Sequence, residues 1–591
     1  MPRKARIAMP AAFLLAVLAS AQQVQVREEM LANGMKLLLV ERHDSPTVSC
    51  GWVARVGSVN EAPGITGISH LFEHMMFKGT KAIGTTDFAR DAEILKQQDA
   101  IRSQMEKEYT LLRERARRGE IMDSIYDPAN MTPTLKELKG QLEKLYAAEK
   151  EVVVSEELEK IYTREGASGS NAGTTEDQTF YFVTLPANKL QLWFWMESDR
   201  LLNPVFREFY SERDVVREER RLRVESTPTG MVDEAFDAMF WQSSPYSHPV
   251  VGWPSDVESI SRAQAEGYFG IYYAPNDITA VLVGDFDPSQ ALALARQYFE
   301  RIPHGAVTPP EMITTEVSQV AERRLVAEAD TNPEVGIRYH TVPFNHRDSF
   351  ALELLADLLN KRTGRLYKAL VEGQGAVVGE PSAYYRGLKY EGYIELRAEV
   401  KEGRKVEEVE AALLAELANL DKEPVSEREL QKVKNQELAN SFRRLQSNMS
   451  LLFQCMLYDS LDNWRYINTA PAKVQAVTAG DIQRVVHTYL TPEKRNVEIY
   501  LRKAGAAAED PELAAMPPQV KAMVAQQVAE FEQMTDVAKL AGTVAQMRQM
   551  VGQAPPQMKP AIQYLIKKAQ DRLDALQSGK TPPKGGSGPK G

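Results

Sequence analysis

The stretch from Pro63 to Thr80 limits the possible folds most, because it predicts a helix whose two faces need different surroundings. At roughly 100° per residue, its large apolar side chains gather in one stripe that a core must cover: Ile68, Leu71, Phe72, Met75 and Met76. His70, Glu73 and His74 gather on the opposite side and form the pattern H-x-x-E-H. A fold of this chain therefore has to bury one face of the helix and leave the other for polar chemistry.

The polar face of this helix suits a metal ion. Two histidines four residues apart on a helix point the same way, so their ring nitrogens can bind one ion. Glu73 lies one turn from His70, where its carboxylate can reach a water molecule on that metal. A solvated polar face with a local Glu–His pair is the plainer alternative. Because H-x-x-E-H is a pattern of zinc hydrolases, a zinc-dependent hydrolase is the leading hypothesis. Catalytic zinc usually has three protein ligands, so one is still missing.

The segment from Glu208 to Glu225 predicts a second helix that can supply the missing ligand. Glu212 and Glu219 are seven residues apart and share one side of it, whereas Glu218 falls among the arginines. We expect the shared side to be buried, together with the apolar residues Phe209, Val215, Val216 and Leu222. A buried carboxylate needs a partner. An arginine could serve, but the upstream motif favours a zinc ion for Glu219.

Composition indicates an exported globular protein. The chain has 591 residues, 43% hydrophobic and 26% charged residues and a net charge of −10, which allows two or more domains and argues against nucleic-acid binding. Basic residues precede an apolar run that ends in Ala19-Ser20-Ala21, so residues 1–21 predict a cleaved signal peptide and a periplasmic or secreted location. The run is too short to span a membrane comfortably. Cys50 and Cys455 favour two buried free thiols over a disulfide.

An internal repeat predicts two related domains. Val257 to Pro275 and Val474 to Pro492 each contain a helix, a tyrosine and a proline, and a strand follows each of them. We predict an α+β fold of two homologous domains, residues 24–305 and 320–503, joined by a linker over 306–319. Each should be a mostly antiparallel sheet with helices packed on one face. The second domain has no histidine in the corresponding helix, Phe350 to Leu359, so one Zn2+ per chain is expected.

Three further segments complete the predicted organisation. Two amphipathic helices form a helical hairpin inserted at about 93–165, which serves either as a structural arm or as a gate. Asn171 to Val183 is predicted to be a strand. Residues 504–577 form a helical extension with two helices, Val520 to Met550 and Pro556 to Leu576, and residues 578–591 a disordered tail.

Three motifs together resemble the pitrilysin family of zinc peptidases, which includes the mitochondrial processing peptidases and insulin-degrading enzyme. They are H-L-F-E-H-M-M-F-K-G-T at 70–80, N-A-G-T-T-E-D-Q-T-F-Y at 171–181 and E-R-D-V-V-R-E-E at 212–219. The resemblance covers most of residues 25–503. It implies a zinc metalloendopeptidase acting on peptides or unfolded polypeptides.

The resemblance also implies a role for each candidate residue. His70, His74 and Glu219 would bind zinc, and Glu73 would be the catalytic base. Glu212 would be a supporting carboxylate. Asn171 and Ala172 would lie on an edge strand that pairs with an extended substrate peptide.

The sequence departs from the family in two places. The gap between His74 and Glu219 is far longer than usual, and the helical hairpin accounts for the excess. Members often carry an Arg and a Tyr, seven residues apart, that contact substrate in the second domain, but here Val371 and Val378 occupy those positions. The nearby candidates are weak substitutes or belong to another segment: Arg365, Tyr367, Tyr384 and Tyr385.

The missing pair leaves two possibilities open. Either the oxyanion is stabilised differently, or a partner subunit in a homodimer or a heterodimer supplies the Arg and the Tyr. A peptide-binding or assembly subunit without catalysis is the alternative function.

Overall fold

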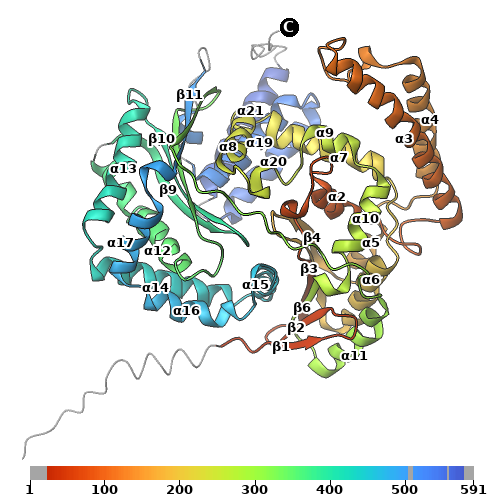
Figure 1. Cartoon of the computed structure of the whole chain (residues 1–591), viewed down its shortest axis with the longest axis horizontal. Helices are drawn as coiled ribbons and strands as arrows, with labels where there is room; N and C mark the ends of the chain where they lie inside the picture. The colour runs from red at the N-terminus through yellow and green to blue at the C-terminus, as the bar shows by residue number, and fades with distance from the viewer. Residues whose placement is uncertain (1–22, 374, 504–509, 515, 556–557, 578–591) are drawn as a thin grey trace, which may run out of the picture.

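The computed structural model describes residues 23–373, 375–503, 510–514, 516–555 and 558–577. The predicted signal peptide and C-terminal tail lie outside these residues. Two halves lie beside each other, each built around one sheet (Figure 1). In the described part of the chain, no helix is long and apolar enough to cross a membrane.

The N-terminal half contains a six-stranded sheet. Its strands, in spatial order, are β1 (Arg27–Met30), β2 (Lys36–Glu41), β6 (Ile278–Gly284), β3 (Thr47–Ala54), β5 (Thr179–Pro186) and β4 (Ser168–Thr174). All neighbouring pairs are antiparallel except β2 and β6. The predicted strand from Asn171 to Val183 is wrong in detail, because the chain turns back at Thr175–Gln178 and forms the hairpin β4–β5. This turn leaves β4 at the edge of the sheet.

The C-terminal half repeats the same topology. Its strands, in spatial order, are β7 (Arg323–Ala329), β11 (Arg495–Arg502), β8 (Glu334–Thr341), β10 (Gly392–Val400) and β9 (Val377–Gly387). This order matches β2-β6-β3-β5-β4 strand for strand, and here too only the first pair, β7 with β11, is parallel. The predicted α+β fold of two homologous, mostly antiparallel units is confirmed.

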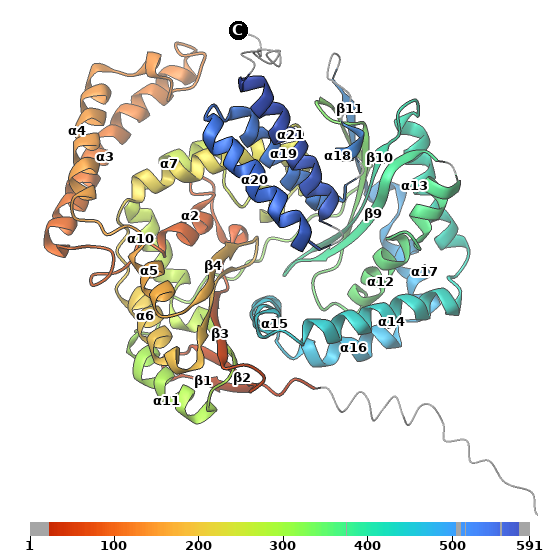
Figure 2. The ribbon, with the colours of Figure 1, turned by 180° about the vertical axis from the view of Figure 1, so that it is seen from behind.

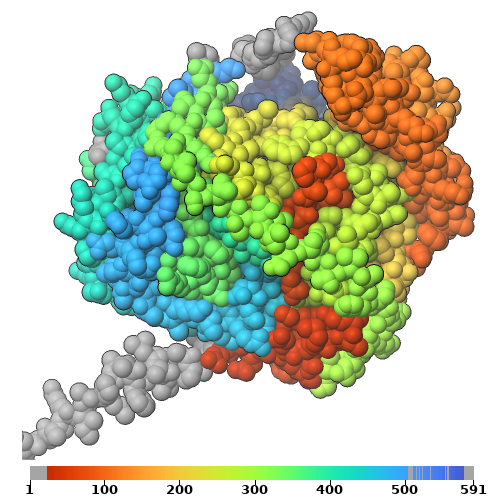
Figure 3. Space-filling model, in the orientation of Figure 1, coloured from red at the N-terminus to blue at the C-terminus, as the bar shows by residue number. Residues whose placement is uncertain are grey.

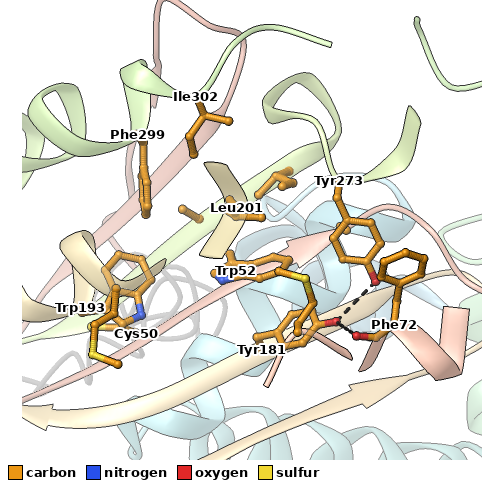
Figure 4. Packing of buried hydrophobic residues seen from close by; sticks show 14 of the residues in the cluster. Cys50, Trp52, Phe72, Tyr181, Trp193, Leu201, Tyr273, Phe299 and Ile302 are labelled. Carbon is orange, nitrogen blue, oxygen red and sulfur yellow. Dashed lines mark hydrogen bonds between the residues drawn. The ribbon is translucent and has the colours of Figure 1, made fainter. Parts of the chain in front are cut away.

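Helices cover one face of each sheet, as predicted. On the first sheet these include α2 (Ile68–Met75), α6 (Leu190–Leu202), α10 (Arg262–Tyr272) and α11 (Pro288–Tyr298). On the second they include α12 (Ser349–Leu359), α13 (Val406–Lys422) and α17 (Ala479–Tyr489). In the first core, Trp52 stacks on Tyr181 with ring centroids 4.2 Å apart, and the Tyr181 hydroxyl donates to the Phe72 carbonyl oxygen at 3.1 Å (Figure 4). That bond fixes α2 to the sheet.

The opposite face of each sheet is covered by a helix from the other half. Helix α15 (Asn448–Leu461) packs on the first sheet, and α8 (Gly230–Phe240) packs on the second (Figure 1). At Gly51 a Cβ atom would lie 2.7 Å from the carbonyl oxygen of Tyr181 in β5 and 3.0 Å from the sulfur of Met456 on α15, so a side chain here would crowd both the sheet and this helix. The prediction of helices on one face was therefore incomplete. Every residue of β6 is buried, as expected for a strand that is covered on both faces.

Two helical segments lie outside this duplicated body. Helices α3 (Phe88–Arg117) and α4 (Pro133–Lys150) form the predicted antiparallel hairpin, which projects as an arm with a small core of its own (Figure 3). The C-terminal extension forms α19 (Pro518–Gln533), α20 (Val537–Gln553) and α21 (Lys559–Gln577), with its own core, at the back of the molecule (Figure 2). Two helices were predicted here. The first divides at Met534–Asp536, where the Asp536 carboxylate caps α20.

Candidate metal centre

Helix α2 is fixed at its N-terminus by a buried carboxylate. Glu61 accepts hydrogen bonds from the backbone N–H groups of Gly67, at 2.7 Å, and Ser69, at 2.8 Å. These N–H groups have no partner within the helix, so the Glu61 carboxylate satisfies them and complements the helix dipole. Gly67 has a φ of +88°, and a Cβ atom there would lie 2.6 Å from the carbonyl oxygen of Val251. The start of α2 is therefore held in one position, with its five apolar residues buried as predicted.

His70, His74 and Glu219 come together where α2 meets α7 (Phe209–Arg220). Their potential ligand atoms all lie within 4.8 Å of one another. His70 Nε2 lies 3.7 Å from one Glu219 oxygen, and His74 Nε2 lies 3.3 Å from the other. Two imidazoles and one carboxylate are a donor set that zinc uses in catalytic sites. The three residues therefore fit a zinc ion.

The two histidines differ in charge. Burial lowers the pKa of His70 to about 4, so this ring is neutral at pH 7, as a metal ligand must be. Burial also disfavours the charged form of His74, but its hydrogen bonds to Glu212 and Glu219 outweigh burial and raise its pKa to about 9. Without a metal, His74 is therefore a cation between two carboxylates. A metal ion at His74 Nε2 would replace that proton.

Glu212 orients His74. One oxygen of its carboxylate lies 3.0 Å from His74 Nδ1, and the other lies 2.6 Å from Lys78 Nζ. Because Nδ1 is occupied in this way, Nε2 is left facing Glu219. A carboxylate in this position fixes the tautomer and the direction of a ligating ring.

Glu73 lies beside the cluster on a cavity of about 450 Å³. The cavity is also lined by His74, Phe77 and Asn171, and by the loop 153–159. Burial raises the pKa of the Glu73 carboxyl, which suits a group that has to take up a proton.

The strand β4 places Asn171 and Ala172 at the edge of the first sheet. Asn171 pairs with Phe182 and Ala172 with Tyr181 on β5, and β4 has no neighbour on its other side within the described sheet. Helix α2 packs against β4, so this edge runs past the metal cluster. An open edge near the cluster can accept another extended chain as an additional strand.

The predicted apolar face of α7 is partly wrong. Phe209 and Val216 are buried, but Val215 and Leu222 are 49% and 53% exposed. Arginines take buried positions instead, for example Arg220, which pairs with Glu234 at 2.7 Å. The long stem of an arginine can pack like an apolar side chain when its charged end is paired, and hydrophobic periodicity does not reveal this.

Sequence reasoning missed Arg207, whose side chain is fully buried. It forms an ion pair with Asp91 on α3 at 2.9 Å and donates to the carbonyl oxygens of Lys78, Thr80 and Ile83. It therefore holds the loop after α2 against the base of the inserted arm. The only local sign of this buried arginine in the sequence is the pair Gly79 and Gly84. Both have a positive φ, and a Cβ atom on either would crowd the Arg207 side chain.

The residues around the missing Arg/Tyr pair have other partners. Val371 lies in the π-helical segment Tyr367–Gly373, and Val378 lies in β9. Arg365 forms a bidentate pair with Glu429, both distances being 2.9 Å, and Tyr385 donates to the Val342 carbonyl oxygen. Among the described residues, no hydrogen bond or ion pair joins these side chains to the metal cluster.

Two family models match the chain. The model described as insulinase (peptidase family M16) matches residues 36–162, and the model described as the peptidase M16 inactive domain matches residues 259–437. The first match contains the H-x-x-E-H motif. Glu212 and Glu219 lie between the two matched stretches.

The curated relatives include proteins named as zinc proteases. Zinc protease PqqE of Helicobacter pylori is 24% identical over 426 residues, which is 71% of this chain and 80% of the relative. Probable zinc protease PqqL of Escherichia coli is 22% identical over 69% of this chain, which spans only 38% of that protein.

Solved structures share the fold. A protease from Helicobacter pylori has a TM-score of 0.66 and 21% identity, over 81% of this chain and all of the other. The periplasmic protease PqqL from Escherichia coli has a TM-score of 0.61 and 18% identity, over 85% of this chain and 50% of the other. At these identities the structural likeness establishes the fold alone.

Proposed function

The chain belongs to peptidase family M16, and from this premise we propose that it is a zinc metalloendopeptidase that hydrolyses peptides or unfolded polypeptides. The observation that carries the proposal is the cluster of His70, His74 and Glu219, with ligand atoms within 4.8 Å of one another and Glu73 on the adjoining cavity. We infer one zinc ion per chain, because α12, the counterpart of α2 in the second half, has no histidine.

His70, His74 and Glu219 would hold the ion. A bound zinc ion supplies Lewis acidity, which polarises a peptide carbonyl and makes water more acidic. The Glu73 carboxylate takes the proton of the attacking water and passes it to the nitrogen of the leaving amine. Glu212 keeps His74 in the tautomer that leaves Nε2 free for the metal.

The edge strand β4 supports a polypeptide as the substrate. Backbone pairing at Asn171 and Ala172 would hold a peptide extended beside α2, because an added strand must adopt the extended conformation. A folded protein cannot offer such a segment without local unfolding, so short or unfolded chains are favoured. We also propose export to the periplasm or beyond, as for the periplasmic relative PqqL.

A second candidate function is a peptide-binding subunit without catalysis. It is favoured by Val371 and Val378 at the positions of the expected Arg/Tyr pair and by the match of residues 259–437 to the inactive-domain model. If catalysis needs that pair, a related subunit in a dimer would supply it.

Cleavage of a mixed peptide library by the zinc-loaded chain separates the two candidates. The matched variants are Glu73→Gln, which removes the proposed base, and Glu218→Gln, an exposed glutamate on α7 that pairs with Arg221. We expect cleavage by the wild type and by Glu218→Gln, and none by Glu73→Gln. Bound zinc with no cleavage in any form would support the binding subunit, and equal cleavage by Glu73→Gln would refute the proposed mechanism.

A further inference from the structure

A second cavity, of about 330 Å³, lies in the C-terminal half. It is lined by α12, β9, α14 (Glu427–Arg444), α15 and α16 (Tyr466–Ala476), and by the β4–β5 turn of the other half. In the shared topology, α12, β9 and α14 correspond to α2, β4 and α7, the elements around the metal cluster. The packing matches too, since α2 contacts β4 and α7 while α12 contacts β9 and α14. The duplicated unit has therefore kept a cavity at the equivalent place, with different side chains.

Glu353 on α12 is a carboxylate in the lining of this cavity that Arg444 influences only at longer range, without a direct contact. Among the residues that the structure describes, no hydrogen bond or ion pair engages its side chain. The other acidic groups of the lining are paired: Glu437 with Arg444 at 2.5 Å, Glu176 with Arg386, and Asp177 with the hydroxyl of Tyr246 and the backbone N–H of Lys389. Glu353 is partly buried and lines the cavity, so a cation or a hydrogen-bond donor in the cavity would stabilise its carboxylate.

Aromatic rings form the wall of the cavity. Phe344 lies 4.5 Å from Tyr466 and 5.6 Å from Tyr458, measured between ring centroids, and the two tyrosines are 4.7 Å apart. Tyr385 adds a fourth ring to the lining. The face of an aromatic ring attracts a cation, and the attraction grows where water is excluded.

The lining does not suit a metal ion. In the described part of the chain, the only group of three or more His, Cys, Asp or Glu residues with ligand atoms close enough to share an ion is His70, His74 and Glu219. A carboxylate beside aromatic rings instead fits an organic cation, whose N–H groups can donate to the carboxylate while its charge lies against the rings.

We propose that this cavity binds an alkylammonium or guanidinium group, with Glu353 as its counter-ion and Phe344, Tyr458 and Tyr466 as its wall. The cation could be a free amine or the basic side chain of a polypeptide. The cavity volume suits a group of this size. The site is separate from the proposed catalytic centre and requires no turnover.

The charges around Glu353 give the site a pH dependence. Burial, with Glu437 and Asp357 as like-charged neighbours, raises the pKa of Glu353 to about 7, and Arg444 opposes this rise. The other titratable groups in the lining are Glu176, Asp177, Arg386, Tyr384, Tyr385, Tyr458 and Tyr466. Because the ionised carboxylate is the form that attracts a cation, binding should be about 10-fold tighter at pH 8 than at pH 6.

The test measures the affinity of small cations by isothermal titration calorimetry. The protein is the zinc-loaded chain carrying Glu73→Gln, so that no peptide is cleaved. The probes are ethylguanidinium, butylammonium and a capped Ala-Arg-Ala peptide, with Ala-citrulline-Ala as the neutral match. Glu353→Gln should weaken binding of the cationic probes at least about 10-fold, as expected for loss of a charge-assisted hydrogen bond. Glu407→Gln, an exposed glutamate on α13, is the matched control and should bind like the parent.

Each result decides the proposal. Binding of the free cations and of the arginine peptide supports a general cation site, and binding of the arginine peptide alone supports a site for polypeptide side chains. No binding below about 10 mM, equal binding of the citrulline peptide, or full affinity in Glu353→Gln overturns it. If Glu353→Gln does not fold, the pH comparison on the parent decides, together with Glu353→Lys, which places its own ammonium group in the cavity and should abolish binding.

Discussion

Replacing Glu212 tests whether zinc binding depends on a carboxylate that does not belong to the ligand cluster. Its two oxygens hold His74 Nδ1 at 3.0 Å and Lys78 Nζ at 2.6 Å. With Nδ1 engaged, His74 Nε2 faces Glu219 at 3.3 Å. Without Glu212, the His74 ring loses its fixed tautomer and direction, and Lys78 retains only Glu208 as its partner.

Glu212→Gln and Glu212→Ala should weaken zinc binding to different extents. Glu212→Gln keeps an amide oxygen that can accept from His74 Nδ1 but loses the charge, so we expect about 10-fold weaker zinc binding, or about 1.4 kcal/mol. Glu212→Ala removes the hydrogen bond as well and should weaken binding about 100-fold, or about 2.7 kcal/mol.

Competition with a chromogenic chelator at pH 7.5 measures the zinc affinity directly, without any assumption about substrate. Glu218→Gln is the control, because Glu218 lies on the same helix, is exposed and pairs with Arg221 at 2.6 Å. It should bind zinc like the wild type. A Glu212→Ala variant that binds zinc within about 3-fold of the wild type would refute the orienting role.

Three other predictions concern the zinc ligand His70, the buried pair of Arg207 and Asp91, and the buried ring of His340. Zinc at about 100 times its Kd should add about 2.7 kcal/mol to the free energy of unfolding of the wild type and nothing to that of His70→Ala, measured by urea denaturation with and without chelator; equal gains would contradict the proposed site. Arg207→Ala should lower the free energy of unfolding by about 3–5 kcal/mol, because Asp91 is left buried and unpaired. A decrease below about 1 kcal/mol in urea denaturation would show that the pair is dispensable. Burial lowers the pKa of His340, which is stacked on Phe240, from 6.5 to about 4, so the unfolded chain takes up a proton at this histidine before the folded chain does as the pH falls. Relative to His340→Phe, the free energy of unfolding of the wild type should therefore fall by about 2 kcal/mol between pH 8 and pH 5. Parallel pH profiles of the two proteins in urea denaturation would refute this.

Local patterns in the sequence predicted the elements and the faces that they bury. The spacing of Ile68, Leu71 and Phe72 predicted which side of α2 enters the core, since a period of 3.6 residues defines a face regardless of what covers it. The repeat predicted the duplicated fold, and the shared strand order confirms it.

Where local signals were mixed, the predictions failed. The sequence predicts one strand where the structure has the hairpin β4–β5, because the turn Thr175–Gln178 contains no glycine or proline to mark it. The apolar pattern of Glu208 to Glu225 predicts that Val215 and Leu222 are buried, but both are exposed and arginines such as Arg220 take buried positions instead.

The sequence by itself determined that His70, Glu73 and His74 share one side of a helix, because helical spacing is local. It also indicated a carboxylate on a second helix. Only the tertiary structure decided that Glu219 meets the two histidines across the long insertion, and that Arg207 holds the loop after α2. It alone showed that each sheet is covered by a helix of the other half and that the second half has a cavity around Glu353. The physical reason is the same in each case: periodicity specifies the face that a segment buries, whereas the partner on that face is selected by packing among segments far apart in the chain.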